Sequence, residues 1–146
     1  MNDALNQVLA PLINKLSPVG RKIVLRKITT HLRGSNQQRI KAQENPDSTP
    51  YAPRKLNAAF KGLLQKRGPM FAKLRLNKHM GLRVSTNEAV LGFAGRAGFI
   101  ARQHQDGTTD NTGGKAIPTT KRQLLGITAD DEQAILSIVF DHLDQP

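Results

Sequence analysis

Hydrophobic residues recur at helical spacing in the first 44 residues of the chain. Between residues 3 and 16 one falls every three or four positions, which is the period of an amphipathic helix. Those positions are Leu5, Val8, Leu9, Leu12, Ile13 and Leu16. The same period continues from residue 18 to 44 through Val24, Leu25, Ile28 and Leu32. Ser17 followed by Pro18 is typical of a helix N-cap and first turn, so we predict two helices that meet there, with Gly34-Ser35 a candidate interruption of the second.

The middle of the chain changes to short apolar segments that are typical of strands. Residues 70–76, 81–85 and 89–95 are such segments, and Thr86-Asn87 between the last two is a plausible hairpin turn. Residues 106–115 contain no large apolar side chain, which predicts a surface loop. We therefore expect a small antiparallel sheet with a β-hairpin, followed by long polar loops.

A final helix is predicted over residues 128–144. Thr128 is a suitable cap, and acidic residues follow it in the first turn, where they suit the helix dipole. Polar residues form one stripe along this helix, namely Asp130, Gln133, Ser137, Asp141 and Asp144. The rest of its circumference is apolar, so the helix needs a cover, and we expect either the sheet of the same chain or a neighbouring subunit to supply it.

These elements predict an α+β fold in a single domain over residues 1–146. The domain divides into a basic helical part (1–45), a proline-rich elbow and basic linker (46–69), the sheet with its loops (70–127), and the C-terminal helix (128–144). A chain of this length buries roughly 70% of its unfolded surface and needs no metal or disulfide to fold.

The proline-rich elbow forbids regular structure directly after the second helix. Each proline lacks a backbone donor and moves the preceding residue out of the helical region. The chain must therefore turn and leave as an extended arm that carries an aromatic anchor. The residues that define this structural elbow are Pro46, Asp47, Pro50, Tyr51 and Pro53.

Charge is unevenly distributed along the chain, whose net charge is +11. Residues 1–83 hold 17 Lys and Arg against 3 acids, a net of +14, and residues 84–146 hold 5 against 8, a net of −3. Lys22, Arg26 and Arg33 fall on one face of the second helix. This basic stripe is either a solvated face or a contact for an acidic partner or DNA. Base stacking on single strands is disfavoured, because the chain has no Trp and one Tyr.

The residues that could carry chemistry are sparse. The absence of cysteine excludes disulfides, thiolate zinc sites and cysteine catalysis, and it fits assembly in a reducing cytoplasm. The four histidines have no metal-ligand spacing, and His104 with Asp106 lacks a third ligand nearby in the sequence. No leader, membrane span, phosphate-binding loop or nucleophile motif is recognisable. We expect no enzyme activity, no cofactor, no metal and no membrane contact.

Four segments, in order along the chain, resemble the phage virion morphogenesis family, and within it the tail completion proteins of contractile-tailed temperate phages. They are the basic helix ending in Gln43-Glu44-Asn45-Pro46-Asp47-Ser48-Thr49-Pro50-Tyr51-Ala52-Pro53, Met70-Phe71-Ala72-Lys73-Leu74, Ile100-Ala101-Arg102-Gln103-His104-Gln105-Asp106-Gly107, and Leu124-Leu125-Gly126-Ile127-Thr128. The likeness spans residues 20–143. It departs from the family at Ser48, where the family tends to have a turn glycine, and at Asp106, where it tends to have an aromatic residue.

The resemblance implies a structural role in the virion. Such a protein would complete or cap the head-proximal end of a contractile tail and prepare it for head-tail joining, in the tail-neck region, after assembly in the bacterial host cytoplasm. It would form a homo-oligomeric ring, a hexamer on the sixfold tail. The implied partners are tail tube or sheath proteins and the head-tail connector, with non-specific contact to DNA that passes through the channel.

A head-to-tail ring needs two different, complementary surfaces on each subunit. The basic stripe, Lys22, Arg26 and Arg33, is one candidate, and the acidic stripe, Asp130, Asp141 and Asp144, is the other. The alternative function is non-specific DNA binding through the basic N-terminal half. Salt dependence separates the two, because contacts with phosphates give a steep fall of affinity with salt.

Overall fold

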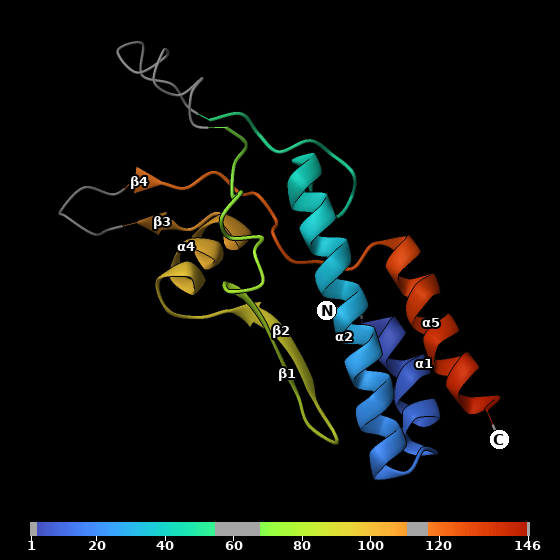
Figure 1. Ribbon diagram of the computed structural model, residues 1–146. Helices are drawn as coiled ribbons and strands as arrows, with labels where there is room; N and C mark the ends of the chain where they lie inside the picture. The colour runs from blue at the N-terminus through green and yellow to red at the C-terminus, as the bar shows by residue number, and fades with distance from the viewer. Residues whose placement is uncertain (1–2, 55–67, 111–116, 146) are drawn as a thin grey trace.

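The computed structural model describes residues 3–54, 68–110 and 117–145. Within these residues the chain forms four helices and two antiparallel two-stranded sheets, with helices at both ends (Figure 1). The helices are α1 (Asp3–Asn14), α2 (Pro18–Ala42), α4 (Gly95–Asp106) and α5 (Ala129–Leu143). The strands are β1 (Met80–Val84), β2 (Ala89–Phe93), β3 (Thr109–Asp110) and β4 (Ile117–Pro118). The predicted α+β class is confirmed.

The helices α1, α2 and α5 pack side by side as one helical layer (Figure 1). Their shared core contains one pair of buried aliphatic residues from each helix, namely Leu5, Leu9, Val24, Ile28, Ile135 and Val139. The two N-terminal helices therefore cover the apolar side of α5. The expected cover by the sheet was wrong, because α1 and α2 present matching apolar stripes to this helix.

The helix α2 is the longest element and takes part in both cores of the protein. It begins as predicted, with Pro18 in its first turn and the Ser17 hydroxyl accepting a hydrogen bond from Gly20 N (3.1 Å). It passes through Gly34-Ser35 without a break, so the candidate interruption is not present. Its N-terminal half packs on α1 and α5, and its C-terminal half carries Ile40 into a second core.

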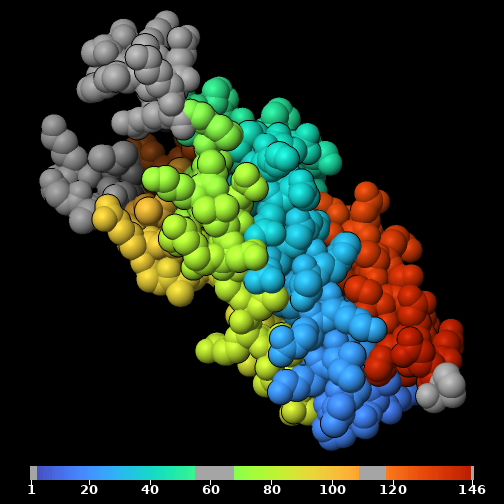
Figure 2. Space-filling model, viewed as in Figure 1, coloured from blue at the N-terminus to red at the C-terminus, as the bar shows by residue number. Residues whose placement is uncertain are grey.

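This second core lies where the C-terminal half of α2 meets the hairpin, α4 and the elbow. Its buried members are Ile40, Tyr51, Met80, Ala101 and Leu124. Figure 2 shows α2 running along the surface between residues 68–90 on one side and α5 on the other. The arrangement brings the 43–54 arm, the hairpin and the 122–126 segment onto one end of a single helix.

The predicted hairpin is confirmed. β1 pairs with β2 from Met80 opposite Phe93 to Val84 opposite Ala89. The backbone N–H of Ser85 donates to the carbonyl of Glu88 (2.7 Å), which closes the turn around Thr86-Asn87. The polar segment 106–115 was predicted to be a loop. Its first residue instead ends α4, and Thr109–Asp110 form β3, which pairs with β4. Residues 111–116 lie outside the described residues.

Residues 70–76, predicted as a strand, instead form consecutive turns that continue to residue 79. Phe71 has a positive φ of 62°, which a strand does not allow. The Gln43 side chain bonds both to Met70 N and to Met70 O, each at 2.8 Å, and so uses polar groups that a neighbouring strand would need. The apolar run in this segment packs on α2 instead of joining the sheet.

Candidate functional site

The elbow turns sharply after α2. The helix ends at Ala42 and is capped by Gln43, whose backbone is left-handed (φ 62°). In the following turn, Ser48 N–H donates to Asn45 O (2.9 Å) and Thr49 N–H donates to the Asp47 carboxylate (3.0 Å). Ser48 has a φ of 66°, a conformation that glycine adopts without strain. A glycine at this position would meet the same backbone requirement.

Tyr51 anchors the extended arm that follows the turn. Its ring is buried, and its hydroxyl donates to the carbonyl of Gln123 (3.0 Å), while Pro50 and Pro53 on either side are exposed. Burial raises the pKa of Tyr51 to about 12, against the opposing effect of the nearby Arg39 charge. The phenol therefore remains a hydrogen-bond donor at neutral pH.

Two further contacts bind the arm to the segment before α5. The buried Arg122 guanidinium donates to the carbonyls of Ala52 (2.7 Å) and Pro53 (2.9 Å). Gly126 lies directly against Pro46, and a Cβ atom at this glycine would lie 2.3 Å from Pro46 Cγ. A side chain there would push the elbow away, so the close approach requires glycine. Pro46, Tyr51 and Pro53 thus join the 43–54 arm to residues 122–126. Asp47 and Pro50 are exposed and make their contacts within the turn itself.

A buried polar network fastens the same segment to α2. The Asn36 side-chain oxygen accepts from Arg39 Nη1 (2.9 Å), Arg39 Nη2 (2.6 Å) and Gly126 N (2.9 Å). Arg39 Nη2 also lies 3.3 Å from the carbonyl of Leu124. Arg39 is only 8% exposed, and burial lowers its pKa. Neutral oxygens therefore hold a buried cation, with Asn36 as its principal acceptor.

Asp131 connects α5 to α2. Thr128 and Asp131 form the predicted cap of α5, with Asp131 N donating to Thr128 Oγ1 (3.1 Å) and Thr128 N donating to Asp131 Oδ2 (3.0 Å). His31 Nε2 lies 3.0 Å from Asp131 Oδ1. Burial alone would raise the pKa of Asp131, but hydrogen bonds from Ser35, Thr128 and His31 hold the pKa below its usual value. This carboxylate is structural and faces inward.

The basic stripe on α2 lies on the surface. Lys22 and Arg26 are exposed and Arg33 is half-buried. No carboxylate in residues 3–54, 68–110 and 117–145 forms an ion pair with any of the three. Val19 (70% exposed) and Ile23 (42% exposed) lie beside them in the N-terminal half of the same helix. This part of α2 thus combines unpaired cations with exposed aliphatic side chains.

The acidic stripe on α5 is also on the surface. Asp130, Asp141 and Asp144 are exposed, and none of them forms an ion pair with a Lys or Arg of the described residues. Phe140, expected to be covered with the other apolar residues of α5, is 49% exposed because it lies at the edge of the contact with α1 and α2. The outer side of α5 therefore offers acids next to one exposed aromatic ring.

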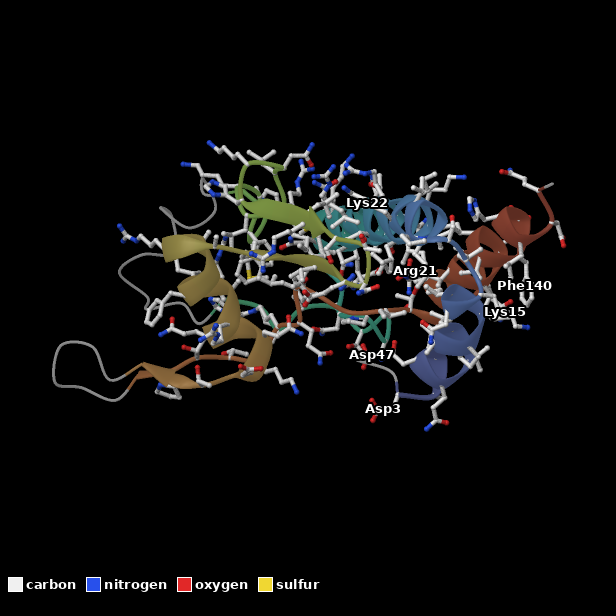
Figure 3. All side chains as sticks on the ribbon, turned by 90° about the horizontal axis from the view of Figure 1, so that it is seen from below. Asp3, Lys15, Arg21, Lys22, Asp47 and Phe140 are labelled. Carbon is white, nitrogen blue, oxygen red and sulfur yellow. The ribbon has the colours of Figure 1, made fainter. Side chains whose placement is uncertain are left out.

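The structure does not bring the two stripes into contact with each other. They lie on neighbouring helices, each facing solvent, and these helices are joined instead through the inward-facing Asp131, which contacts His31 and Ser35 of α2. Figure 3 shows nitrogen atoms gathered along the upper edge, above β1 and α2, where Lys22 is labelled. In the same view Asp3 and Asp47 lie on the lower side and Phe140 lies at the α5 end.

The described residues contain no cluster of three or more His, Cys, Asp or Glu that could hold a metal. His104 is half-buried, packs edge-on against Phe71 (4.8 Å between ring centroids) and lies 3.4 Å from the carbonyl of Thr120. Burial lowers the pKa of His104, and Asp106 is exposed.

Among the described helices, none has the length and apolar character of a membrane span.

Sequence reasoning assigned no fastening role to the residues that hold the elbow, namely Asn36, Arg39, Gln43, Arg122 and Gly126, although Gln43 and Gly126 stand within the segments of the family resemblance. One signal was present in the sequence. Polar side chains at Asn36, Gln37 and Arg39 surround Ile40, although the helix must bury this part of its surface. Buried polar groups need hydrogen-bond partners, so this cluster indicated a polar contact on the covered side.

Comparison with known proteins agrees with the resemblance of the elbow and the later segments. The sequence profile of the phage virion morphogenesis family matches residues 1–144. Tail completion protein S of Escherichia phage P2 is 38% identical over 140 residues, which cover 94% of this chain and 93% of that protein. No solved structure matches the chain. The matched region takes in the helical layer, the elbow and α5, and so the chain belongs to the phage virion morphogenesis family.

Proposed function

We propose that the protein is a structural component of a contractile phage tail that completes or caps its head-proximal end and prepares it for head-tail joining. The observation that carries this proposal is the similarity to tail completion protein S over 94% of the chain. The protein would assemble in the host cytoplasm and remain in the tail-neck region of the virion. Its partners there would be tail tube or sheath proteins and the head-tail connector.

We further propose a homo-oligomeric ring, a hexamer on the sixfold tail. A closed ring of head-to-tail contacts needs two different surfaces that complement each other. The basic stripe on α2 and the acidic stripe on α5 are opposite in charge, solvent-facing and on different helices, which supports this arrangement. Each subunit would place its α5 against α2 of the next.

Exposed apolar residues support the same pairing. Protein interfaces have an apolar or aromatic centre with a polar rim. Val19 and Ile23 beside the basic stripe, and Phe140 beside the acidic stripe, would supply such a centre. In the proposed contact the Phe140 ring of one subunit packs on Val19 and Ile23 of its neighbour, and the charged residues surround it.

Deletion of the gene from the phage tests the tail function. We expect the lysate to contain full heads and assembled tails that are not productively joined, because the proposed protein acts at their junction. Electron microscopy of the lysate counts the free and joined forms, and a plasmid copy of the gene provides the control. Normal joined particles in the deletion lysate would overturn the proposal.

A charge-swap series tests the ring contact. Lys22→Glu with Arg26→Glu should weaken subunit association about 100-fold or more, because like charges then face each other across the contact. Asp141→Lys with Asp144→Lys should do the same. The thermal melt should barely move, since each exposed substitution shifts stability by about 0.5 kcal/mol or less. Native mass spectrometry measures association, and immunoblots of purified tails measure incorporation.

The combined variant with all four reversals restores opposite charges across the contact, so it should recover assembly. Arg96→Glu with Arg102→Glu, two exposed cations on α4, serves as the matched control and should assemble as the parent does. If both double variants assemble like the parent at physiological salt, the two stripes are solvated surfaces and the ring contact lies elsewhere.

A further inference from the structure

Next to the basic stripe lies a second group of cations that the proposed subunit contact does not use. Lys41 is in the last turn of α2, and Lys73, Arg75 and Lys78 are in the turn segment 70–79 that packs beside it. Lys41, Lys73 and Lys78 are exposed and Arg75 is half-buried. These four residues form the 41–78 surface. From this surface we infer a binding site for the phosphate backbone of double-stranded DNA, independent of the proposed ring.

The backbone under the 41–78 surface is firmly held. Gln37 Nε2 donates to Arg75 O (2.8 Å) and to Asn77 Oδ1 (2.7 Å), which fixes the turn segment to α2 one turn before Lys41. Phe71 anchors the start of the segment, with its ring edge-on to Tyr51 at a centroid distance of 5.7 Å. The inward side chains of the segment pack in the second core, so its cations point to solvent from a rigid support.

No acid balances these cations locally. Residues 17–43 and 68–84 contain no Asp or Glu, and they lie side by side along α2. Glu44 is the nearest acid in sequence to Lys41, and the described residues contain no ion pair between them. Figure 3 shows the resulting row of nitrogen atoms at the upper edge of the view. The charged side chains that these two segments contribute to this face are therefore all basic.

The proposed ring cannot neutralise this face. Six Lys and Arg of α2 and residues 70–79 are exposed, namely Lys22, Arg26, Lys27, Lys41, Lys73 and Lys78. The acidic stripe of a neighbouring subunit offers three exposed carboxylates, Asp130, Asp141 and Asp144. In a closed ring each basic face meets one acidic stripe, so each subunit keeps unneutralised cations on this face after assembly. A polyanion from outside the ring fits this surplus.

The composition of the 41–78 surface favours DNA over an acidic protein. Protein interfaces are depleted in lysine and have an apolar centre. This surface is lysine-rich, and Leu76 is the large apolar residue exposed within residues 70–79. Contact with duplex phosphates needs only Lys and Arg, whereas single strands also need aromatic side chains for stacking. The surface therefore fits a duplex, without preference for sequence.

Fluorescence anisotropy with a labelled duplex of about 30 base pairs tests this site on the full-length protein. Four phosphate contacts predict a slope of about −3.6 for log affinity against log salt, so affinity should fall about 100-fold between 50 and 200 mM salt. Lys41→Gln, Lys73→Gln and Lys78→Gln combined should reduce the slope to about −1 and weaken binding at 50 mM salt at least about 10-fold. The same three positions changed to Arg should bind like the parent.

The matched control removes three exposed cations elsewhere, Lys15→Gln, Arg96→Gln and Arg102→Gln, and should keep most of the affinity and slope. A thermal melt verifies that each variant is folded, and native mass spectrometry verifies that the Gln variant assembles like the parent.

The proposal is overturned if the parent does not bind the duplex at 50 mM salt, or if the control variant loses as much affinity as the Gln variant. Loss of tail incorporation by the Gln variant, with unchanged DNA binding, would instead assign the surface to an acidic protein. The ring proposal is untouched by any of these DNA results.

Discussion

Replacing Ile135 with alanine is expected to lower the free energy of unfolding by about 2–5 kcal/mol, because the substitution leaves a cavity in a close-packed core. Ile135 is 1% exposed and lies at the centre of the layer formed by α1, α2 and α5. For a chain of this size each kcal/mol shifts the melting temperature by about 2–4 °C, so the Tm should fall by roughly 4–20 °C. Circular dichroism melts of parent and variant give the comparison.

Ile138→Ala is the matched control on the same helix. Ile138 is only partly buried at the edge of the same core, so its truncation removes less buried surface and should cost less than half as much. Equal losses at the two positions would contradict the packing described for α5. They would indicate that Ile138 is covered by something other than α1 and α2.

Asn36→Ala is expected to destabilise the protein by about 3 kcal/mol or more, since it removes the main acceptor of a buried charged group. Asn36 is 1% exposed, and its side-chain oxygen receives two hydrogen bonds from Arg39 and one from Gly126 N. Without it, the guanidinium keeps, among the described residues, only the longer contact with Leu124 O (3.3 Å). Urea unfolding measures the change in free energy.

The double variant Asn36→Leu with Arg39→Met separates the buried charge from simple loss of packing. Replacing both partners by apolar groups of similar size avoids an unpaired buried cation, so this variant should be clearly more stable than Asn36→Ala. A loss of under about 1 kcal/mol in the free energy of unfolding for Asn36→Ala would mean that the Arg39 guanidinium donates to water or to another acceptor in that variant. The network would then not hold residues 124–126 on α2.

Local signals correctly predicted the elements that depend on neighbours in the sequence. The 3.6-residue period identified α1, α2 and α5, and Ser17 and Thr128 identified two of the helix starts. The prolines after residue 45 predicted the elbow, and Thr86-Asn87 predicted the hairpin turn. These signals act through backbone geometry over a few residues, so no knowledge of the fold was needed to interpret them.

The candidate partner surfaces were only partly accessible to sequence reasoning. The sequence shows where the charges are, and the helical period places Lys22, Arg26 and Arg33 on one face. Their exposure, the exposed Val19 and Ile23 beside them, and the half-exposed Phe140 depend on how three helices pack. The 41–78 surface arises because a turn segment folds onto α2, which the apolar pattern of residues 70–76 had indicated would be a strand.

By itself, the sequence determined α1, α2, α5, the hairpin, the elbow, the charge of each stripe and the resemblance to one family of phage proteins, whereas α4 was not predicted as a helix. Only the tertiary structure decided what covers α5, how the elbow is fastened and which charges face solvent. The contacts responsible join residues far apart in the chain, since Arg39 meets Leu124, Asn36 meets Gly126 and His31 meets Asp131 across 85, 90 and 100 positions. Such contacts depend on the relative positions of whole elements, and periodicity within one element carries no information about them.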